Sequence, residues 1–347
     1  MTQTRNGILF VCESVGSLNI ARRVVKHFDF KCPIYVFTLD SLLIERKQEL
    51  EPFNYITTDP HTVPGMLAHI KLVFLGAHES TPHCRTSNAI GFIAKKTGTA
   101  LASIQHGWIQ PGHNFTSSIK RIAYRGISTD NSRSLFHFSQ ILSFFGDDGI
   151  GYPYPADEPA TAIKNNKNII IATNFNWGIY DQSQVDTFTN SVKSLRNRFP
   201  DWTIVHRPHP AEKQETIENT WAAIYQEYNI GSTRENSESQ ELSWPSLVVS
   251  TPSSIALDYI TIKTPTVLYS TDLLRPFMQE LSLESNTFCE PDEFIGAINR
   301  AGANTEKAIP KFPSKAFIST IHRLFETNKP FNLSEENFLK FGAFLKT

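Results

Sequence analysis

A short run of basic and proline residues, HRPHP at positions 206–210, has the clearest potential for chemistry in this sequence. Arg207 can donate two parallel hydrogen bonds to a phosphate, and His209 can donate an N–H to charge that develops on a departing phosphate oxygen. The two prolines restrict the backbone of the run. Because the run is rich in donors and poor in acceptors, we interpret it as an anion-binding segment rather than a turn with surface histidines.

Hydroxyl side chains gather in a second segment, STPSS at positions 250–254, before a predicted helix that starts at Ser253 and carries Asp258. Hydroxyls and free amide N–H groups at a helix start bind anions, and the helix dipole adds to the attraction. Ser253 or Ser254 can also be an ordinary N-cap. Beside the 206–210 run, phosphate binding is the better interpretation, and Asp258 then orients a ligand hydroxyl or anchors the helix.

Two residues are candidates for a general base. His106 follows a predicted strand at 101–105 and stands next to Gly107, so a ligand can approach it closely. It can remove a proton from an acceptor hydroxyl, or it can be a structural histidine that bonds a loop carbonyl. Glu13 follows the predicted strand at 7–12 and is the second candidate, although its carboxylate can instead cap the helix that comes next.

The loop TNFNWG at 173–178 carries Thr173 and Asn174, whose side chains suit the lining of a ligand site. The sequence has no GxGxxG after a strand, no GxxxxGK[ST], no GxSxG and no HExxH, so the dinucleotide, P-loop, hydrolase and zincin classes lack support. It also has no Asp-x-Asp pair to hold a metal-bound nucleotide diphosphate. We therefore expect a site without metal or cofactor, in which arginine, histidine, hydroxyls and helix ends replace the cation.

Each of these segments follows a short, continuous run of apolar residues. Such runs alternate with helical patterns, which predicts an α/β chain with parallel sheets covered by helices on both faces. The predicted strands fall into two series: 7–12, 32–38, 72–76 and 101–105, then 168–173, 202–205, 246–250 and 266–270. In such sheets ligands bind at the carboxyl ends of the strands, which is where the candidate residues lie.

A segment dense in glycine and proline, residues 147–167, separates the two series and marks the predicted domain boundary. We expect a Rossmann-like acceptor domain over 1–150 and a Rossmann-like donor domain over 151–347, with the last helix returning to the first domain. The first 150 residues carry a net charge of +4 (15 basic and 11 acidic residues), and the remainder carries −5. This asymmetry favours different ligands for the two domains.

The composition limits the class of protein. With 347 residues and 40% apolar residues, the chain can build two domains with substantial cores. Its 33 basic and 34 acidic residues argue against a nucleic-acid binder, and four scattered cysteines without a CxxC pair favour a reducing cytoplasm. No secretory signal or run of about 18 apolar residues occurs. We expect a cytoplasmic protein whose basic run, Arg22, Arg23 and Lys26, suits acidic acceptors or peripheral association with the inner face of the plasma membrane.

Four segments carry a resemblance to a known family: QHG (105–107), GIGYPYPADE (149–158), RPHP (207–210) and STPSSIALDYITIKTPTVLYSTD (250–272). In this order they resemble the CDP-glycerol glycerophosphotransferases, the teichoic-acid polymerases and related enzymes of surface and capsule polysaccharides. The last segment is the most specific, because the family has paired serines, a helix aspartate, a basic residue close to a proline, and a strand that ends near an aspartate. The matching residues are Ser253, Ser254, Asp258, Lys263, Pro265 and Asp272.

The resemblance implies a GT-B fold, in which two Rossmann-like domains face a central cleft and C-terminal helices pack back toward the first domain. It implies a metal-independent transferase with a cytidine-nucleotide donor of the CDP-glycerol or CDP-alditol type and a glycan or lipid-linked glycan acceptor. By analogy, His106 is the acceptor-side base, and Arg207 and His209 hold the donor phosphates. The family often has a Thr-Pro-Leu-Lys-like sequence after its His-Gly, whereas residues 108–111 are WIQP here, which leaves the acceptor and the transferred group open.

Three alternatives stay open at this point. The HP pair also fits a glycosyltransferase that uses a CMP-activated acidic sugar, such as a sialic acid-like sugar or Kdo. A UDP-sugar epimerase of the same fold is the second alternative. The third is a non-catalytic nucleotide- or glycan-binding protein, for which His106→Ala would leave the phenotype intact.

Overall fold

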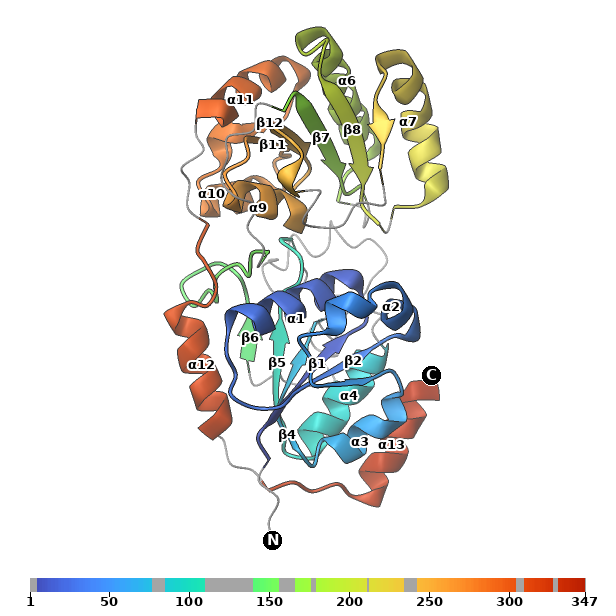
Figure 1. Cartoon of the computed structure of the whole chain (residues 1–347), viewed down its shortest axis with the longest axis vertical. Helices are drawn as coiled ribbons and strands as arrows, with labels where there is room; N and C mark the ends of the chain where they lie inside the picture. Colours follow the sequence, from blue (N-terminus) through green and yellow to red (C-terminus); the bar gives the residue numbers. More distant parts are fainter. Residues whose placement is uncertain are drawn as a thin grey trace. The chain divides into compact units, whose positions relative to one another are not determined.

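The structure of the chain is a computed structural model, and it forms two compact units (Figure 1). The first unit contains residues 1–115, 126–156 and 310–347, and the second contains residues 116–125 and 157–309. The residues that the structure describes are 5–76, 85–109, 140–155, 166–175, 179–210, 212–233, 242–303, 309–326 and 330–346.

The first unit is built on a six-stranded parallel sheet in the order β3-β2-β1-β4-β5-β6. Its strands are β1 (Gly7–Cys12), β2 (Ile34–Thr38), β3 (Tyr55–Thr57), β4 (Ile70–Leu75), β5 (Ala100–Ile104) and β6 (Gln140–Leu142). Ile8 to Cys12 are at most 1% exposed. The continuous apolar runs therefore mark strands that are covered on both faces, as expected for a parallel sheet.

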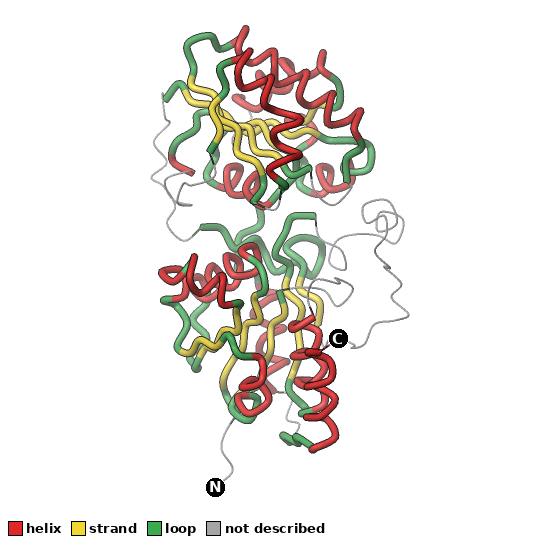
Figure 2. Tube along the Cα trace, turned by 90° about the vertical axis from the view of Figure 1, so that its right-hand side faces the viewer, coloured by secondary structure: helices red, strands yellow, loops and turns green. Residues whose placement is uncertain are grey.

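Helices cover this sheet on two sides, as the tube in Figure 2 also shows. They are α1 (Val15–His27), α2 (Asp40–Glu45), α3 (Val63–Met66), α4 (Arg85–Lys96), α12 (Lys315–Glu326) and α13 (Glu335–Lys346), with 3-10 turns at Lys47–Leu50 and Pro60–Thr62. Leu9 and Val11 of β1 share a core with Ile90 and Ile93 of α4 and with Phe341 of α13. Side chains alternate along a strand, so β1 presents its other residues to the opposite face.

That opposite face holds a cluster of aromatic rings. Phe10 of β1 packs on Phe74 of β4, with ring centroids 4.9 Å apart, and on Phe30, with ring centroids 6.2 Å apart. Phe28 meets Phe317 of α12 edge to face at 5.2 Å. Both C-terminal helices, α12 and α13, thus pack in the first unit, as expected for the fold class.

The segment predicted as the domain boundary is anchored to the first unit by basic side chains. Arg23 is only 4% exposed, and its Nη1 donates to the Tyr152 hydroxyl (3.1 Å) and to the Pro153 carbonyl (3.3 Å). Nε2 of His27 lies 2.8 Å from the Tyr154 carbonyl oxygen. Arg23 is therefore a structural residue and does not offer its charge to an acidic acceptor or a lipid surface.

The second unit repeats the architecture with its own parallel sheet, in the order β12-β11-β10-β7-β8-β9. The strands are β7 (Asn168–Thr173), β8 (Thr203–Pro208), β9 (Gly231–Ser232), β10 (Leu247–Ser250), β11 (Thr266–Tyr269) and β12 (Thr287–Phe288). The helices are α6 (Gln182–Arg198), α7 (Gln214–Tyr228), α9 (Ser254–Thr261), α10 (Arg275–Glu280) and α11 (Pro291–Ala303), with a 3-10 turn at Glu284–Asn286. The predicted α/β class with two parallel sheets is confirmed.

The order of strands in the second sheet decides which loops become neighbours. β7 lies between β10 and β8, so the loops that follow these three strands adjoin at the carboxyl edge. Phe188 of α6 and Trp221 of α7, both at most 1% exposed, belong to the core beneath this edge.

Across the described parts of the chain, no helix has both the length and the apolar character needed to span a membrane.

Candidate functional site

Two cross-links join three strand-end loops at the carboxyl edge of the second sheet. The backbone N–H of Asn174, just after β7, donates to Oγ1 of Thr251, just after β10 (2.8 Å). The next N–H, that of Phe175, donates to Oε1 of Glu212, beyond β8 (2.8 Å). The loop after β7 is therefore hydrogen-bonded to both of its neighbours, and we call these joined strand ends the platform.

The start of α9 lies on this platform and leaves its N-cap hydroxyl unused. Ser253 has the extended backbone of an N-cap residue (φ −156°, ψ 166°), but its side chain makes no capping hydrogen bond. Ser253 is 9% exposed, and its Oγ is buried without a hydrogen-bond partner among the described residues. An N-cap serine normally satisfies an amide of the first turn. Here the hydroxyl satisfies no amide of the first turn, and the dipole of α9 favours negative charge at this helix start.

The structure separates the two histidines of the 206–210 run. His206 is fully buried in β8, with its ring stacked on Trp221 at 3.8 Å between centroids. Its Nδ1 lies 2.6 Å from the Tyr225 hydroxyl, and its Nε2 lies 2.8 Å from Oγ1 of Thr173. His206 is therefore part of the core, and it is not one of the donors at the edge.

His209 and Arg207 occupy the edge itself and are partly exposed. Burial, and second to it the positive charge of Arg207, lowers the pKa of His209 to about 4. At neutral pH His209 is thus uncharged and can donate a ring N–H, while Arg207 supplies the positive charge.

The remaining predicted residues of this edge fall into two groups. Thr173 is 4% exposed, and its hydroxyl is 2.8 Å from His206 Nε2 and 3.3 Å from Glu212 Oε2, so it works inside the platform. Asp258 is 2% exposed within α9. Asn174 and Ser254 are partly exposed, at the loop after β7 and at the first residue of α9.

Sequence reasoning missed Glu212 and did not single out Thr251. Both carry their cross-links from buried positions, with exposures of 5% and 0%. Thr251 stands inside the STPSS segment, so the gathering of hydroxyl residues there could have identified it. Glu212 stands two residues after Pro210, and nothing in its neighbourhood distinguishes it from a surface glutamate.

At the carboxyl edge of the first sheet, Gln105 shapes the loop that carries His106. Its Nε2 donates to the carbonyls of Gly107 (2.7 Å) and Trp108 (2.8 Å), and its Oε1 accepts from the N–H of Phe144 (2.7 Å). The sequence analysis had assigned Gln105 no role beyond its place in the QHG segment. The structure makes it the residue that positions His106.

The ring of His106 packs against the start of α1. A Cβ added at Gly16 would lie 3.2 Å from His106 Cδ2, so a larger residue there would have to displace the imidazole by a few tenths of an ångström. Burial lowers the pKa of His106 to about 4, although a hydrogen bond with the backbone of Gly76 acts in the opposite direction. The imidazole is therefore neutral near pH 7, and it is less basic than an ordinary histidine.

The second candidate base, Glu13, is already engaged. Its Oε2 accepts the backbone N–H of Ser87 in the first turn of α4, at 2.8 Å. The following helix, α1, is instead capped by Ser14, which forms a capping box with Ser17. Glu13 therefore has the geometry of a helix cap.

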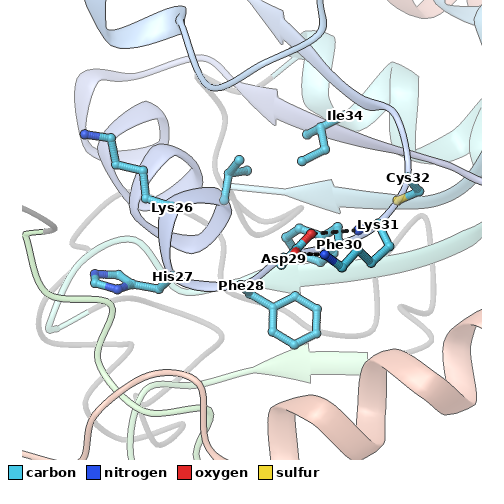
Figure 3. Close-up of a pocket in the computed structure, with 9 residues that line it drawn as sticks. Lys26, His27, Phe28, Asp29, Phe30, Lys31, Cys32 and Ile34 are labelled. Carbon is cyan, nitrogen blue, oxygen red and sulfur yellow. Dashed lines mark hydrogen bonds and ion pairs between the residues drawn. The ribbon is translucent and has the colours of Figure 1, made fainter.

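A pocket of about 370 Å³ lies far from these residues in the fold, between the end of α1 and the start of β2 (Figure 3). It is lined by residues 25–32 and Ile34. Because α1 connects the carboxyl end of β1 to the amino end of β2, this pocket is at the opposite edge of the first sheet from His106. Among the described residues, no group of three or more histidine, cysteine or acidic side chains could hold a metal ion.

No protein-family model matches the sequence, and no curated protein matches it. Solved structures do match the fold. A Listeria monocytogenes protein described as a candidate UDP-N-acetylglucosamine 2-epimerase has a TM-score of 0.63 at 10% identity, over 95% of this chain and 99% of that one. The structure of S. aureus MnaA with UDP has a TM-score of 0.60 at 10% identity, over 94% of this chain and 100% of that one. The UDP-GlcNAc 2-epimerase of Methanocaldococcus jannaschii, in complex with UDP-GlcNAc and UDP, has a TM-score of 0.56 at 10% identity, over 93% of this chain and 100% of that one. The chain therefore has a GT-B-like fold of two Rossmann-like units.

Proposed function

We propose that this chain is a transferase that binds a nucleotide-activated donor at the carboxyl edge of its second sheet and transfers the activated group to a glycan hydroxyl. The observation that carries the proposal is the start of α9, where the hydroxyl of Ser253 occupies the N-cap position without capping the helix. In this proposal the start of α9 binds the anion together with Arg207 and the neutral His209 of the loop after β8. Similar structures that contain UDP or UDP-GlcNAc support a nucleotide as the anion.

The donor residues suit stabilisation of a leaving phosphate. Arg207 offers a fixed fork of N–H groups to a phosphate, and the start of α9 adds backbone amides and the helix dipole. Charge develops on the bridging phosphate oxygen as its bond to the transferred group breaks, and His209 can donate its N–H to that oxygen. In this proposal the site needs no metal, because these groups supply the electrostatic stabilisation.

His106 takes the role of the base. Its ring is neutral at pH 7, so it can receive the proton of the acceptor hydroxyl as that oxygen forms the new bond. With a CDP-alditol donor, the acceptor oxygen attacks the phosphorus that bears the alditol, the phosphoanhydride bond breaks, and CMP leaves. With a CMP-activated sugar, the acceptor oxygen attacks the sugar carbon and CMP leaves with both electrons of the broken bond.

A cytidine donor of the CDP-glycerol or CDP-alditol type is the first choice, and the surface polysaccharide is the acceptor class. This choice rests on the sequence resemblance of the segments between residues 105 and 272. A second candidate is a UDP-sugar epimerase, which the similar structures from Listeria monocytogenes and Methanocaldococcus jannaschii favour. Inversion of a sugar carbon also needs a group that removes a proton and a group that returns one, so His106 would serve both candidates.

Calorimetric titration with CMP, CDP, UDP, CDP-glycerol and UDP-GlcNAc tests the proposal. We expect binding of the cytidine nucleotides, and we expect Arg207→Ala to weaken it. Arg198→Ala is the matched control, because Arg198 is an exposed arginine at the end of α6 in the same unit. Release of CMP in the presence of a glycan acceptor would identify the transferase. Conversion of UDP-GlcNAc to its 2-epimer without transfer would replace it by the epimerase, and no binding of any nucleotide would overturn both.

A further inference from the structure

Glu212 is a buried carboxylate that the proposed reaction does not use. It precedes α7 and is 5% exposed. Its Oε1 accepts the N–H of Phe175 (2.8 Å), and its Oε2 accepts the hydroxyl of Thr173 (3.3 Å). Its own backbone N–H donates to the carbonyl of His209 (2.8 Å). One residue therefore joins the loop after β7 to the loop after β8.

The directions of three hydrogen bonds in this cluster follow from Glu212. A carboxylate only accepts, so the single proton of the Thr173 hydroxyl goes to Glu212. The Thr173 oxygen must then accept from Nε2–H of His206, 2.8 Å away. Complete burial disfavours a charged His206 ring, and in the neutral ring Nδ1 is then the acceptor for the Tyr225 hydroxyl at 2.6 Å. The chain of donors thus runs from Tyr225 through His206 and Thr173 to Glu212.

We propose that Glu212 is a positioning residue of the anion site, which sets the tautomer of His206 and holds the loops after β7 and β8 in register. Its role for a ligand rests on the proposed function. The two loops carry Asn174 and His209, so their spacing decides where these side chains stand relative to the start of α9. A buried carboxylate is costly unless it is hydrogen-bonded, and here its partners belong to the loops that need to be fixed.

The substitution Glu212→Gln gives a sharp test of the hydrogen-bond direction. The N–H of Phe175 requires an acceptor, which forces the amide oxygen toward Phe175 and the amide nitrogen toward Thr173. Thr173 must then accept from this amide and donate to Nε2 of His206. The His206 ring would protonate at Nδ1 and donate to Tyr225. The substitution therefore inverts the tautomer of His206 while both Glu212 contacts are preserved.

Imidazole ¹⁵N chemical shifts of the ligand-free protein report this inversion. The His206 signals are assigned through their contacts with the stacked Trp221 ring. We expect the protonated nitrogen to be Nε2 in the wild type and Nδ1 in Glu212→Gln. The matched control is Glu215→Gln, because Glu215 is an exposed glutamate in the first turn of α7, and it should leave the tautomer unchanged. The same tautomer in the wild type and Glu212→Gln would overturn the proposal.

Loop positioning is measured separately from nucleotide binding. In Glu212→Ala, we expect faster hydrogen exchange at the Phe175 amide and a Kd for CDP raised by about tenfold, a loss equivalent to about one hydrogen bond to a charged group. Glu212→Gln should bring both the Phe175 exchange rate and the Kd for CDP back toward the wild-type values.

The outcomes separate the positioning role from the proposed function. If the wild type binds no nucleotide, the proposed function fails, and the Phe175 exchange still decides whether Glu212 fixes the loop. Unchanged exchange in a folded Glu212→Ala protein would contradict the positioning role. If Glu212→Ala does not fold, Thr173→Val removes the hydroxyl link instead, with unchanged CDP binding as the contradicting result.

Discussion

At the edge of the first sheet, polar side chains bond to the protein's own backbone. Gln105 uses its amide on three backbone groups, Glu13 caps α4, and Ser14 caps α1. At the edge of the second sheet, the buried side chains of Thr251 and Glu212 join neighbouring loops, and Ser253 at the helix start makes no capping hydrogen bond. The first edge is organised to hold one neutral imidazole in place, whereas the second is organised to present several donors. In the proposed function, this difference would separate a base at the first edge from an anion site at the second, although both edges follow parallel strands.

The largest expected effect is on turnover at the first edge. His106→Ala should lower the rate of group transfer by about 10²–10⁴-fold, the range for loss of a general base, and should leave the donor Kd unchanged. His61→Ala, at an exposed histidine of the same unit, is the control. Steady-state assay of CMP release measures the rate. If His106→Ala turns over at close to the wild-type rate, His106 is not the base, and the two edges do not differ in the way proposed.

The next largest effect is on binding at the second edge. Arg207→Ala should raise the nucleotide Kd by about 10- to 100-fold, because a hydrogen bond to a charged group contributes about 1.5–3 kcal/mol. Arg207→Lys should recover only part of the affinity, since a lysine cannot donate two parallel hydrogen bonds. Titration calorimetry with CDP and UDP measures both variants. Equal affinity in all three proteins would mean that the anion site lies elsewhere.

Both edges carry a histidine whose pKa is lowered to about 4 from an ordinary value of 6.5. Between these values the unfolded chain binds more protons than the folded one, so stability falls as pH decreases through this window. We expect the Tm to drop between pH 6.5 and pH 4, and the drop to be smaller in His106→Gln and His209→Gln. Thermal melts across this range provide the measurement. If Tm depends on pH in both variants as steeply as it does in the wild type, these histidines are not the groups that titrate.

The smallest effect distinguishes the two helix starts. Ser14→Ala should lower the free energy of unfolding by about 1 kcal/mol, because it removes a capping box. Ser253→Ala should leave the free energy of unfolding nearly unchanged, since the hydroxyl makes no cap bond, and should weaken nucleotide binding by a few-fold. Chemical denaturation and titration of both variants test this. A destabilised Ser253→Ala protein with normal binding would make Ser253 an ordinary cap.

Local sequence patterns predicted the main elements well. The run GILFVC became β1 and NIIIAT became β7, because continuous apolar segments between turn residues can only be satisfied in a buried parallel sheet. The short strands β3, β6, β9 and β12 were not predicted. Each has only two or three residues, which are too few for a pattern of apolar residues to stand out, and pairing with a neighbouring strand defines it.

The sequence alone determined that donors stand at strand ends, because an apolar strand followed by polar residues places them at the carboxyl edge of a sheet. It could not assign roles within those segments. His206 and His209 are three residues apart, yet one is in the core and the other at the edge, and Glu13 caps a helix whose amide is 74 residues away. These roles depend on hydrogen bonds between residues distant in the chain, which form only when the sheet brings its strand ends together.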